Sequence, residues 1–125
     1  MTKRTFIDMP LGDAIDRVTI LTRKIAFGEE GAYKEHTALT ESIDKLNLKL
    51  TGSILAAITR IAYANFEVWN RENAFRRGED ISAEEVKKMM IEVRDFNKKR
   101  IEAKNEINRM TEMGFREFKV KHRSQ

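Results

Sequence analysis

Apolar side chains recur at steps of three and four residues in four successive stretches of the chain, and this spacing constrains the fold more than any other feature. Such steps place side chains on one face of an α-helix. We therefore predict four main helices. Short connections between successive helices favour antiparallel neighbours, so we expect an all-α fold, either an antiparallel four-helix bundle or paired helical hairpins.

Local signals set the expected bounds of the first two helices. Asp8 followed shortly by Pro10 resembles a helix start, because a short polar side chain can cap and proline is tolerated in the first turn. Gly28 provides a stop. After the break at residues 28–31, a second helix is expected to end at residues 51–52. Its apolar seam consists of His36, Leu39, Ile43, Leu46 and Leu50.

The third and fourth helices carry clearer signals at their ends. Ser53 is expected to cap the third helix, and Gly78 follows its end. Ser82 and Glu85 form a capping box at the start of the fourth helix, which should continue to about Thr111. At roughly 30 residues this helix is about 45 Å long and extends beyond the first two. We expect a second copy of the chain to cover the overhang, giving a homodimer or larger homo-oligomer.

The excess of positive charge lies at the end of the chain. The net charge is +4, and residues 116–125 hold four basic side chains against one glutamate, so the rest of the chain is close to neutral. A duplex-binding domain spreads its basic excess over a folded face, so this distribution argues against a nucleic-acid partner. We divide the chain into one helical domain, residues 1–114, and a basic C-terminal tail or arm, residues 115–125. The tail can be read as a short strand, an arm on a neighbouring molecule, or a frayed end.

The sequence contains none of the common catalytic or metal-binding motifs. The chain has no cysteine, and neither of its two histidines follows a glutamate by three residues, as a carboxylate-bridged dimetal bundle requires. No phosphate-binding glycine loop, nucleophile elbow or Ser/His/Asp arrangement can be picked out. We therefore expect no cofactor, no metal and no catalytic residue. No apolar run is long enough to span a bilayer and no signal peptide is recognisable, so we expect a cytoplasmic protein without a membrane partner.

Polar side chains interrupt the apolar stripes of the first, third and fourth predicted helices. The first contributes Asp16 and Lys24, the third Asn65, Trp69, Glu72 and Arg76, and the fourth Arg94, Asn97, Arg100 and Lys104. Burying such groups without partners costs about 1–3 kcal/mol each and more for charges, so they must pair, reach water or meet a ligand. If a tight turn joins the third and fourth helices, Asn65 lies opposite Arg94. The polar residues then converge on one zone.

Two readings of this zone remain open. In the first, its carboxylates and arginines form buried or half-buried ion pairs that fix the register of the helices. In the second, guanidinium groups such as Arg94 and Arg100 bind a phosphate or carboxylate, while Trp69 stacks on a planar group. The second reading makes the zone a ligand-binding site.

Three segments of the chain resemble a family of small helical bacterial and phage proteins of unknown function. They are residues 11–24 (LGDAIDRVTILTRK), 69–76 (WNRENAFR) and 97–108 (NKKRIEAKNEIN). The family motifs are I-D-[KR]-x-T-I-L-x-x-K, W-x-x-E-x-x-x-R and N-x-x-R-x-x-x-K-x-x-I-N. Position by position, the resemblance picks out Asp16, Thr19, Lys24, Trp69, Glu72, Arg76, Asn97, Arg100, Lys104 and Asn108, and it implies no activity. Asn70 departs from the pattern, in which an acidic residue often follows the tryptophan.

From these patterns we expect a non-catalytic, oligomeric protein that binds a small anionic ligand of nucleotide type. By analogy with small phage proteins that sequester nucleotide immune signals, an anti-defence role is expected. The alternative is a protein-interaction module, an inhibitor or assembly factor, that contacts its partner through the fourth helix and the basic tail. An enzyme that uses Glu72 or Asp16 as a base is a third reading.

Overall fold

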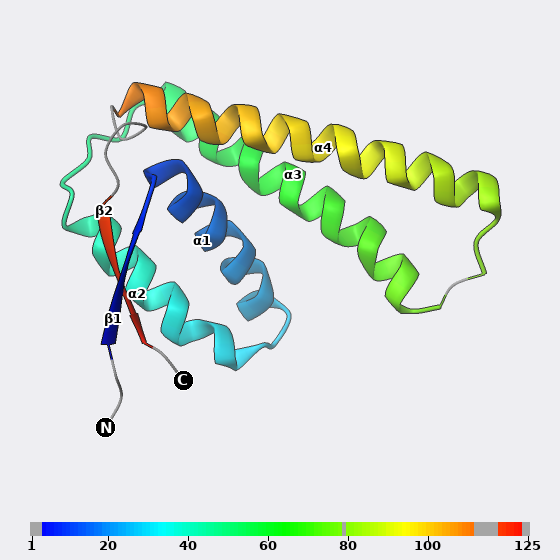
Figure 1. Cartoon of the computed structure of the whole chain (residues 1–125), viewed down its shortest axis with the longest axis horizontal. Coiled ribbons are helices and arrows are strands. Elements are labelled where there is room, and N and C mark those ends of the chain that lie inside the picture. Colours follow the sequence, from blue (N-terminus) through cyan, green and yellow to red (C-terminus); the bar gives the residue numbers. More distant parts are fainter. Residues whose placement is uncertain (1–3, 79, 112–117, 124–125) are drawn as a thin grey trace.

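The computed structural model describes residues 4–78, 80–111 and 118–123. These residues form four α-helices and a two-stranded ribbon. Figure 1 shows the ribbon beside the helices. The helices are α1 (Leu11–Ala26), α2 (Tyr33–Asp44), α3 (Gly52–Arg76) and α4 (Ala83–Met110), and a 3-10 turn, η1 (Glu30–Ala32), precedes α2. The strands are β1 (Arg4–Met9) and β2 (Phe118–Arg123). The predicted all-α class is confirmed. The two-stranded ribbon is an additional element beside the helices.

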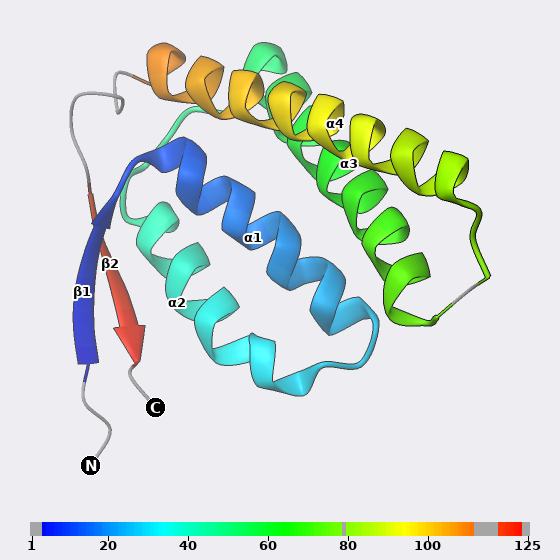
Figure 2. The ribbon, with the colours of Figure 1, turned by 45° about the vertical axis from the view of Figure 1, so that its right-hand side comes forward.

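The helices form two hairpins of unequal length. α1 and α2 make the shorter hairpin, α3 and α4 make the longer one, and α1 packs against both helices of the longer hairpin. Figures 1 and 2 show the closed end of the α3–α4 hairpin extending past the α1–α2 pair. The chain is therefore built as paired helical hairpins. Within the described part of the chain, no helix is long and apolar enough to cross a membrane.

The core lies where α1 packs against the other three helices. Its largest fully buried side chains come from all four helices and are Leu11, Leu21, Leu39, Ile61 and Ile107. Small side chains at Ala14, Ala57 and Ala103 are buried among them and let the helices approach closely. Burying one leucine or isoleucine side chain contributes about 1.5–3 kcal/mol, so this apolar layer holds α1 between the hairpins.

The start of α1 lies directly against α4. Pro10 occupies the N-cap position, where its side chain accepts no hydrogen bond from the first amides of the helix. The amide of Gly12 instead donates a 2.7 Å hydrogen bond to Asn108 Oδ1 of α4. A Cβ atom at Gly12 would collide with the carbonyl oxygen of Lys104, so this close approach requires glycine. Asn108 therefore caps α1 from another helix.

The predicted helix ends are right at the start of α4 and wrong at the end of α2. Ser82 Oγ accepts a 3.2 Å hydrogen bond from the amide of Glu85, which confirms Ser82 as the N-cap. α2 ends at Asp44, because the chain turns there and Asn47 adopts a left-handed backbone with a φ of 49°. Leu50, the last residue of the predicted seam, is outside the helix and 66% exposed.

Two helix starts also differ from those predicted. Thr51 rather than Ser53 caps α3, since Thr51 Oγ1 accepts a 3.2 Å hydrogen bond from the amide of Ile54. Ser53 consequently lies inside the first turn of the helix. Asp8 does not cap α1, because it lies in β1.

An antiparallel ribbon brings the two ends of the chain together. β1 and β2 pair from Arg4 opposite Arg123 to Met9 opposite Phe118. β2 also contacts α2, so the ribbon lies against the shorter hairpin, as Figure 2 shows. Residues 118–123 of the predicted basic tail are thus a strand, and residues 115–117, 124 and 125 lie outside the described residues.

α3 covers the projecting half of α4 along one face. α3 is 25 residues long against 28 for α4, so the overhang is a helical hairpin rather than a single helix. Met90 and Ile101 of α4 do not face the core, since they are 64% and 51% exposed. The helix instead turns Ile107 to the core and Phe96 towards α3, where Tyr63 meets its ring edge to face.

Candidate functional site

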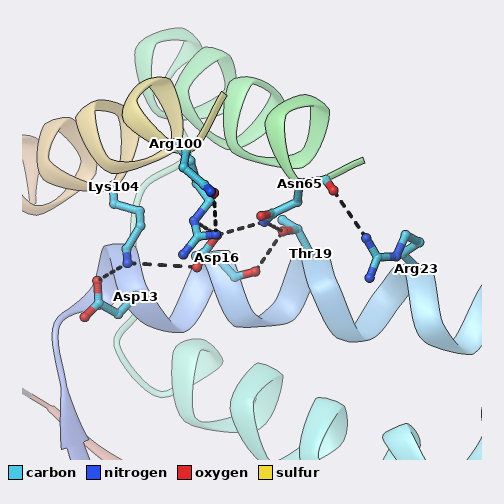
Figure 3. Close-up of polar contacts among 8 residues, drawn as sticks. Asp13, Asp16, Thr19, Arg23, Asn65, Arg100 and Lys104 are labelled. Atoms are coloured by element: carbon cyan, nitrogen blue, oxygen red, sulfur yellow. Dashed lines mark hydrogen bonds and ion pairs between the residues drawn. The ribbon is translucent and has the colours of Figure 1, made fainter. Parts of the chain in front are cut away.

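A buried carboxylate lies where α1, α3 and α4 meet (Figure 3). Asp16 of α1 is 6% exposed, and its Oδ1 accepts a 2.8 Å hydrogen bond from Asn65 Nδ2 of α3. The same oxygen is 3.3 Å from Arg100 Nε of α4, and Asp16 Oδ2 is 3.9 Å from Lys104 Nζ. Four of the predicted site residues, from three helices, are therefore in contact.

Thr19 and Asp13 complete this group. Thr19 Oγ1 donates a 2.8 Å hydrogen bond to the backbone carbonyl of Asp16 and accepts one of 2.9 Å from Asn65 Nδ2. Asp13 Oδ1 lies 3.1 Å from Lys104 Nζ. We call Asp13, Asp16, Thr19, Asn65, Arg100 and Lys104 the buried polar cluster. Its two carboxylates face two cations, and such pairing fixes helix register more than it adds stability.

A groove of about 290 Å³ opens beside the buried polar cluster, between α1, α3 and α4. Six of the predicted site residues line it, namely Lys24, Asn65, Trp69, Glu72, Arg76 and Arg100. The other lining residues are Ile20, Arg23, Glu29 and Val68. Asn65 and Arg100 belong to both the cluster and the groove, so the cluster forms part of the groove wall.

Three predicted site residues of α4 do not line the groove, namely Arg94, Asn97 and Lys104, and Lys104 belongs to the buried polar cluster. Asn97 Oδ1 accepts a 3.1 Å hydrogen bond from Arg100 Nη1, so Asn97 orients a groove residue from outside. Arg94 does not line the groove, and its side chain is 75% exposed, with Nη2 3.4 Å from Asp95 Oδ1. Asn65 does not face Arg94, since it turns towards α1 and bonds Asp16.

The sequence patterns did not select Arg23, although it lines the groove. Its Cζ lies 4.8 Å from the centre of the Trp69 ring, and its Nη1 donates a 3.3 Å hydrogen bond to the backbone carbonyl of Asn65. Burial lowers the pKa of the Arg23 guanidinium, Glu72 raises it, and the positive charge of Arg76 lowers it again. Arg23 forms no ion pair with a described residue. An anion bound here would offset the repulsion between the two arginines.

Phe27 is a second residue that the sequence patterns missed. Its ring centre lies 4.7 Å from that of Trp69, with the two planes inclined at 39°, and its side chain is 61% exposed. Phe27 is the C-cap residue of α1, directly after Ala26. Its amide donates hydrogen bonds to the carbonyls of Arg23 and Lys24. A step of seven residues from Asp16 reaches Arg23, and a further step of four reaches Phe27, so these three residues lie near one face of α1.

The lining of the groove holds more positive than negative charge. Its cations are Arg23, Lys24, Arg76 and Arg100, and its carboxylates are Glu29 and Glu72. Glu72 Oε2 lies 3.4 Å from Arg76 Nη2, a long contact between two largely exposed groups. Among the described residues, no three His, Cys, Asp or Glu side chains are grouped so as to hold a metal ion. The arrangement suits an anion that also carries a planar group.

No family model, curated protein or solved structure matches this chain. The case for a function therefore rests on the geometry of the groove. That geometry brings the three motif segments of the sequence together. Lys24 comes from the first segment, Trp69, Glu72 and Arg76 from the second, and Arg100 from the third.

Proposed function

We propose that the protein binds a small anionic ligand of nucleotide type in the groove between α1, α3 and α4, without catalysing a reaction on it. The observation that carries the proposal is Arg23, a partly buried cation that lies over Trp69 and has no ion-pair partner among the described residues. A guanidinium group binds phosphate through paired N–H donors, and an aromatic ring stacks on a base. Both groups are present side by side.

The surroundings of Arg23 support the same ligand. Lys24 and Arg76 line the groove beside it, and each adds N–H donors for a phosphate. Arg100 enters the groove wall with its guanidinium already held by Asp16 and Asn97. Such prior orientation lowers the entropy lost when a ligand binds.

The carboxylates near the groove support binding rather than catalysis. Asp16 is engaged by Asn65, Arg100 and Lys104, and Glu72 lies beside Arg76. A general base must take up a proton, and a cation paired with a carboxylate makes that carboxylate a weaker proton acceptor. We therefore propose sequestration, in which the protein holds a nucleotide signal in the cytoplasm and keeps it from its receptor, as a phage anti-defence protein does.

Calorimetry against a panel of linear and cyclic nucleotides tests this proposal. We expect the wild-type chain to release or absorb heat with at least one of them. The double variant Arg23→Gln/Arg76→Gln should bind that nucleotide at least about tenfold more weakly, because two charge-assisted contacts to phosphate are removed.

Arg94→Gln is the matched control, since it removes a guanidinium from an exposed position outside the groove. Its affinity should equal that of the wild type. Two results contradict the proposal. One is the absence of heat with every nucleotide when the wild-type chain is folded, and the other is an equal loss of affinity in Arg94→Gln.

We also propose that the chain self-associates through the closed end of the α3–α4 hairpin. Phe75, Met90 and Ile91 lie near this end and are 42%, 64% and 42% exposed. Exposed apolar groups on a projecting element favour burial against another protein. The same surface would serve the alternative function, an interaction module that binds a different partner through helix α4.

Sedimentation velocity tests self-association. We expect the wild-type chain to sediment as a dimer or larger oligomer at micromolar concentration, and Met90→Lys to sediment as a monomer. Ile101→Lys is the control, because Ile101 is 51% exposed on the same helix but lies away from the closed end. A monomeric wild type, or an equal effect of both variants, contradicts self-association through this end.

A further inference from the structure

An exposed aromatic ring stands beside the groove, at a position that the end of α1 fixes. The amide of Phe27 bonds the carbonyls of Arg23 and Lys24, and the next residue, Gly28, turns the chain away with a φ of 92°. The Phe27 ring lies against Trp69 of α3, with the two ring centres 4.7 Å apart. With 61% of its side chain exposed, Phe27 offers an accessible apolar ring to a ligand.

The aromatic pair and the cations of the groove are close to each other. Arg23 lies 4.8 Å from the centre of the Trp69 ring, so one guanidinium joins the aromatic end to the charged end. Arg76 acts on the same guanidinium through its own positive charge, which is one cause of the lowered pKa of Arg23. Two like charges held near each other are stabilised by one shared anion.

The groove is small, and this favours a small ligand. Its volume is about 290 Å³, at the lower end of the range of about 300–1,000 Å³ that small-molecule sites occupy. Among the described residues, Phe27 and Trp69 form the one ring pair beside the groove, with their planes inclined at 39°. One ring pair provides a platform for one base, whereas a dinucleotide needs a place for two.

We infer that the ligand is a mononucleotide, whose single base packs on the exposed side of the Phe27–Trp69 pair and whose phosphate lies between Arg23 and Arg76. This inference rests on the proposed function and narrows it to one ligand class. It also makes Phe27 a residue that determines specificity, because Phe27 presents most of the aromatic surface that is open to a base.

A series of dissected ligands tests the inference by calorimetry on the full chain. The probes are AMP, GMP, CMP and UMP, the nucleoside of the best binder, ribose 5-phosphate, and cyclic di-AMP. We expect the best mononucleotide to bind at least about tenfold more tightly than ribose 5-phosphate and than its nucleoside, because each fragment lacks one of the two contacts.

Three outcomes of this series are informative in different ways. Equal affinity for ribose 5-phosphate and the mononucleotide overturns the base platform. Binding of cyclic di-AMP without binding of any mononucleotide overturns the inferred small size of the ligand but leaves the proposed function standing. No binding of any phosphate-bearing probe contradicts the proposed function itself.

The Phe27→Ala variant distinguishes two roles of the Phe27 ring, which either provides a platform on which the base packs or covers the groove as a lid. If Phe27 is a platform, the variant should bind the best mononucleotide about tenfold more weakly while its affinity for ribose 5-phosphate stays unchanged. Tyr63→Ala is the matched control, because Tyr63 is 60% exposed and also contacts one aromatic ring, but that ring is Phe96, which does not line the groove, whereas Phe27 contacts the groove residue Trp69. Tighter binding by Phe27→Ala would mean that Phe27 covers the groove, and it would overturn the assignment of Phe27.

Discussion

Asp16 is one carboxylate that joins three helices. At 6% exposure it has lost most of its hydration, and that cost must be offset by partners inside the protein. Asn65, Arg100 and Lys104 provide them from α3 and α4. Any other register of α1 against these helices would leave at least one charge buried without a partner, so Asp16 specifies where α1 packs.

Removal of the Asp16 carboxylate should destabilise the fold. Asp16→Ala leaves Arg100 and Lys104, which are 28% and 18% exposed, without their shared counter-charge. We expect the free energy of unfolding, measured with urea, to fall by about 3 kcal/mol. In Asp95→Ala the lost carboxylate is 58% exposed, so the decrease should stay below about 0.5 kcal/mol. Similar decreases in the two variants would show that the buried polar cluster does not hold the helices.

Gly12 and Gly52 should respond in opposite ways to alanine. A Cβ at Gly12 collides with the carbonyl oxygen of Lys104, so we expect Gly12→Ala to lower the free energy of unfolding by about 1–3 kcal/mol. Gly52 begins α3 and has open space around it, so Gly52→Ala should leave stability unchanged or raise it by up to about 1 kcal/mol. Thermal unfolding of both variants checks the pair. A stable Gly12→Ala protein would contradict the close contact between α1 and α4.

At the scale of single residues, the sequence predicted where the polar zone lies better than it predicted which residues form it. Asn65 and Trp69 stood out because polar or amphipathic groups interrupted an apolar stripe. Arg23 and Phe27 sit at the end of α1, where a cation and an exposed ring look like ordinary surface residues. Arg94 was selected for the helix level that it occupies, but its side chain points to solvent. The height of a residue along its helix can be inferred from its distance in sequence to the turn. The direction in which its side chain points depends on how the helix is rotated about its axis.

The α3–α4 hairpin is held beyond the core by a polar link and not by apolar contacts alone. Arg71 of α3 lies 2.7 Å from Glu67 on its own helix and 2.9 Å from Glu92 on α4. Its guanidinium also lies 4.8 Å from the centre of the Phe96 ring. One side chain therefore connects the two helices of the longer hairpin.

This link predicts a pH dependence in the acid range. The hydrogen bond from Arg71 lowers the pKa of Glu92 below its ordinary value of 4.5. A carboxyl with a lower pKa in the folded state stabilises the fold above its unfolded pKa, and this contribution is lost as the pH falls through the folded pKa. Wild type should thus be slightly more stable than Glu92→Gln at pH 7, and this difference should be smaller at pH 3. Urea unfolding at both pH values measures it, and a difference that does not change with pH contradicts the link.

At the scale of elements, signals within one turn predicted well and signals that depend on distant packing did not. Ser82 caps α4 because the serine and the amide that it accepts from lie three residues apart. The end of α2 was misplaced because Leu46 and Leu50 continue the heptad spacing after the helix has stopped at Asp44. An apolar side chain outside a helix can still contact the core, as Leu46 does, so spacing alone does not show where the helix ends.

At the scale of the whole molecule, the groove exists because a short hairpin packs against a longer one. α1 crosses the α3–α4 hairpin partway along its length, and the angle between them leaves an opening beside Trp69 and Arg76. The sequence predicted that polar faces of three helices meet, since unpaired burial would be too costly. It could not predict the opening, because its shape depends on the crossing of two hairpins that are far apart in the chain.

Tryptophan fluorescence offers the most direct test of this groove as the ligand site, because Trp69 is the only tryptophan in the chain. We predict that the best-binding mononucleotide produces a saturable change in emission, with the same midpoint as the calorimetric titration, and that this change shifts to at least about tenfold higher concentration in Arg23→Gln/Arg76→Gln. Binding heat without any change in Trp69 emission would place the ligand elsewhere and contradict the account.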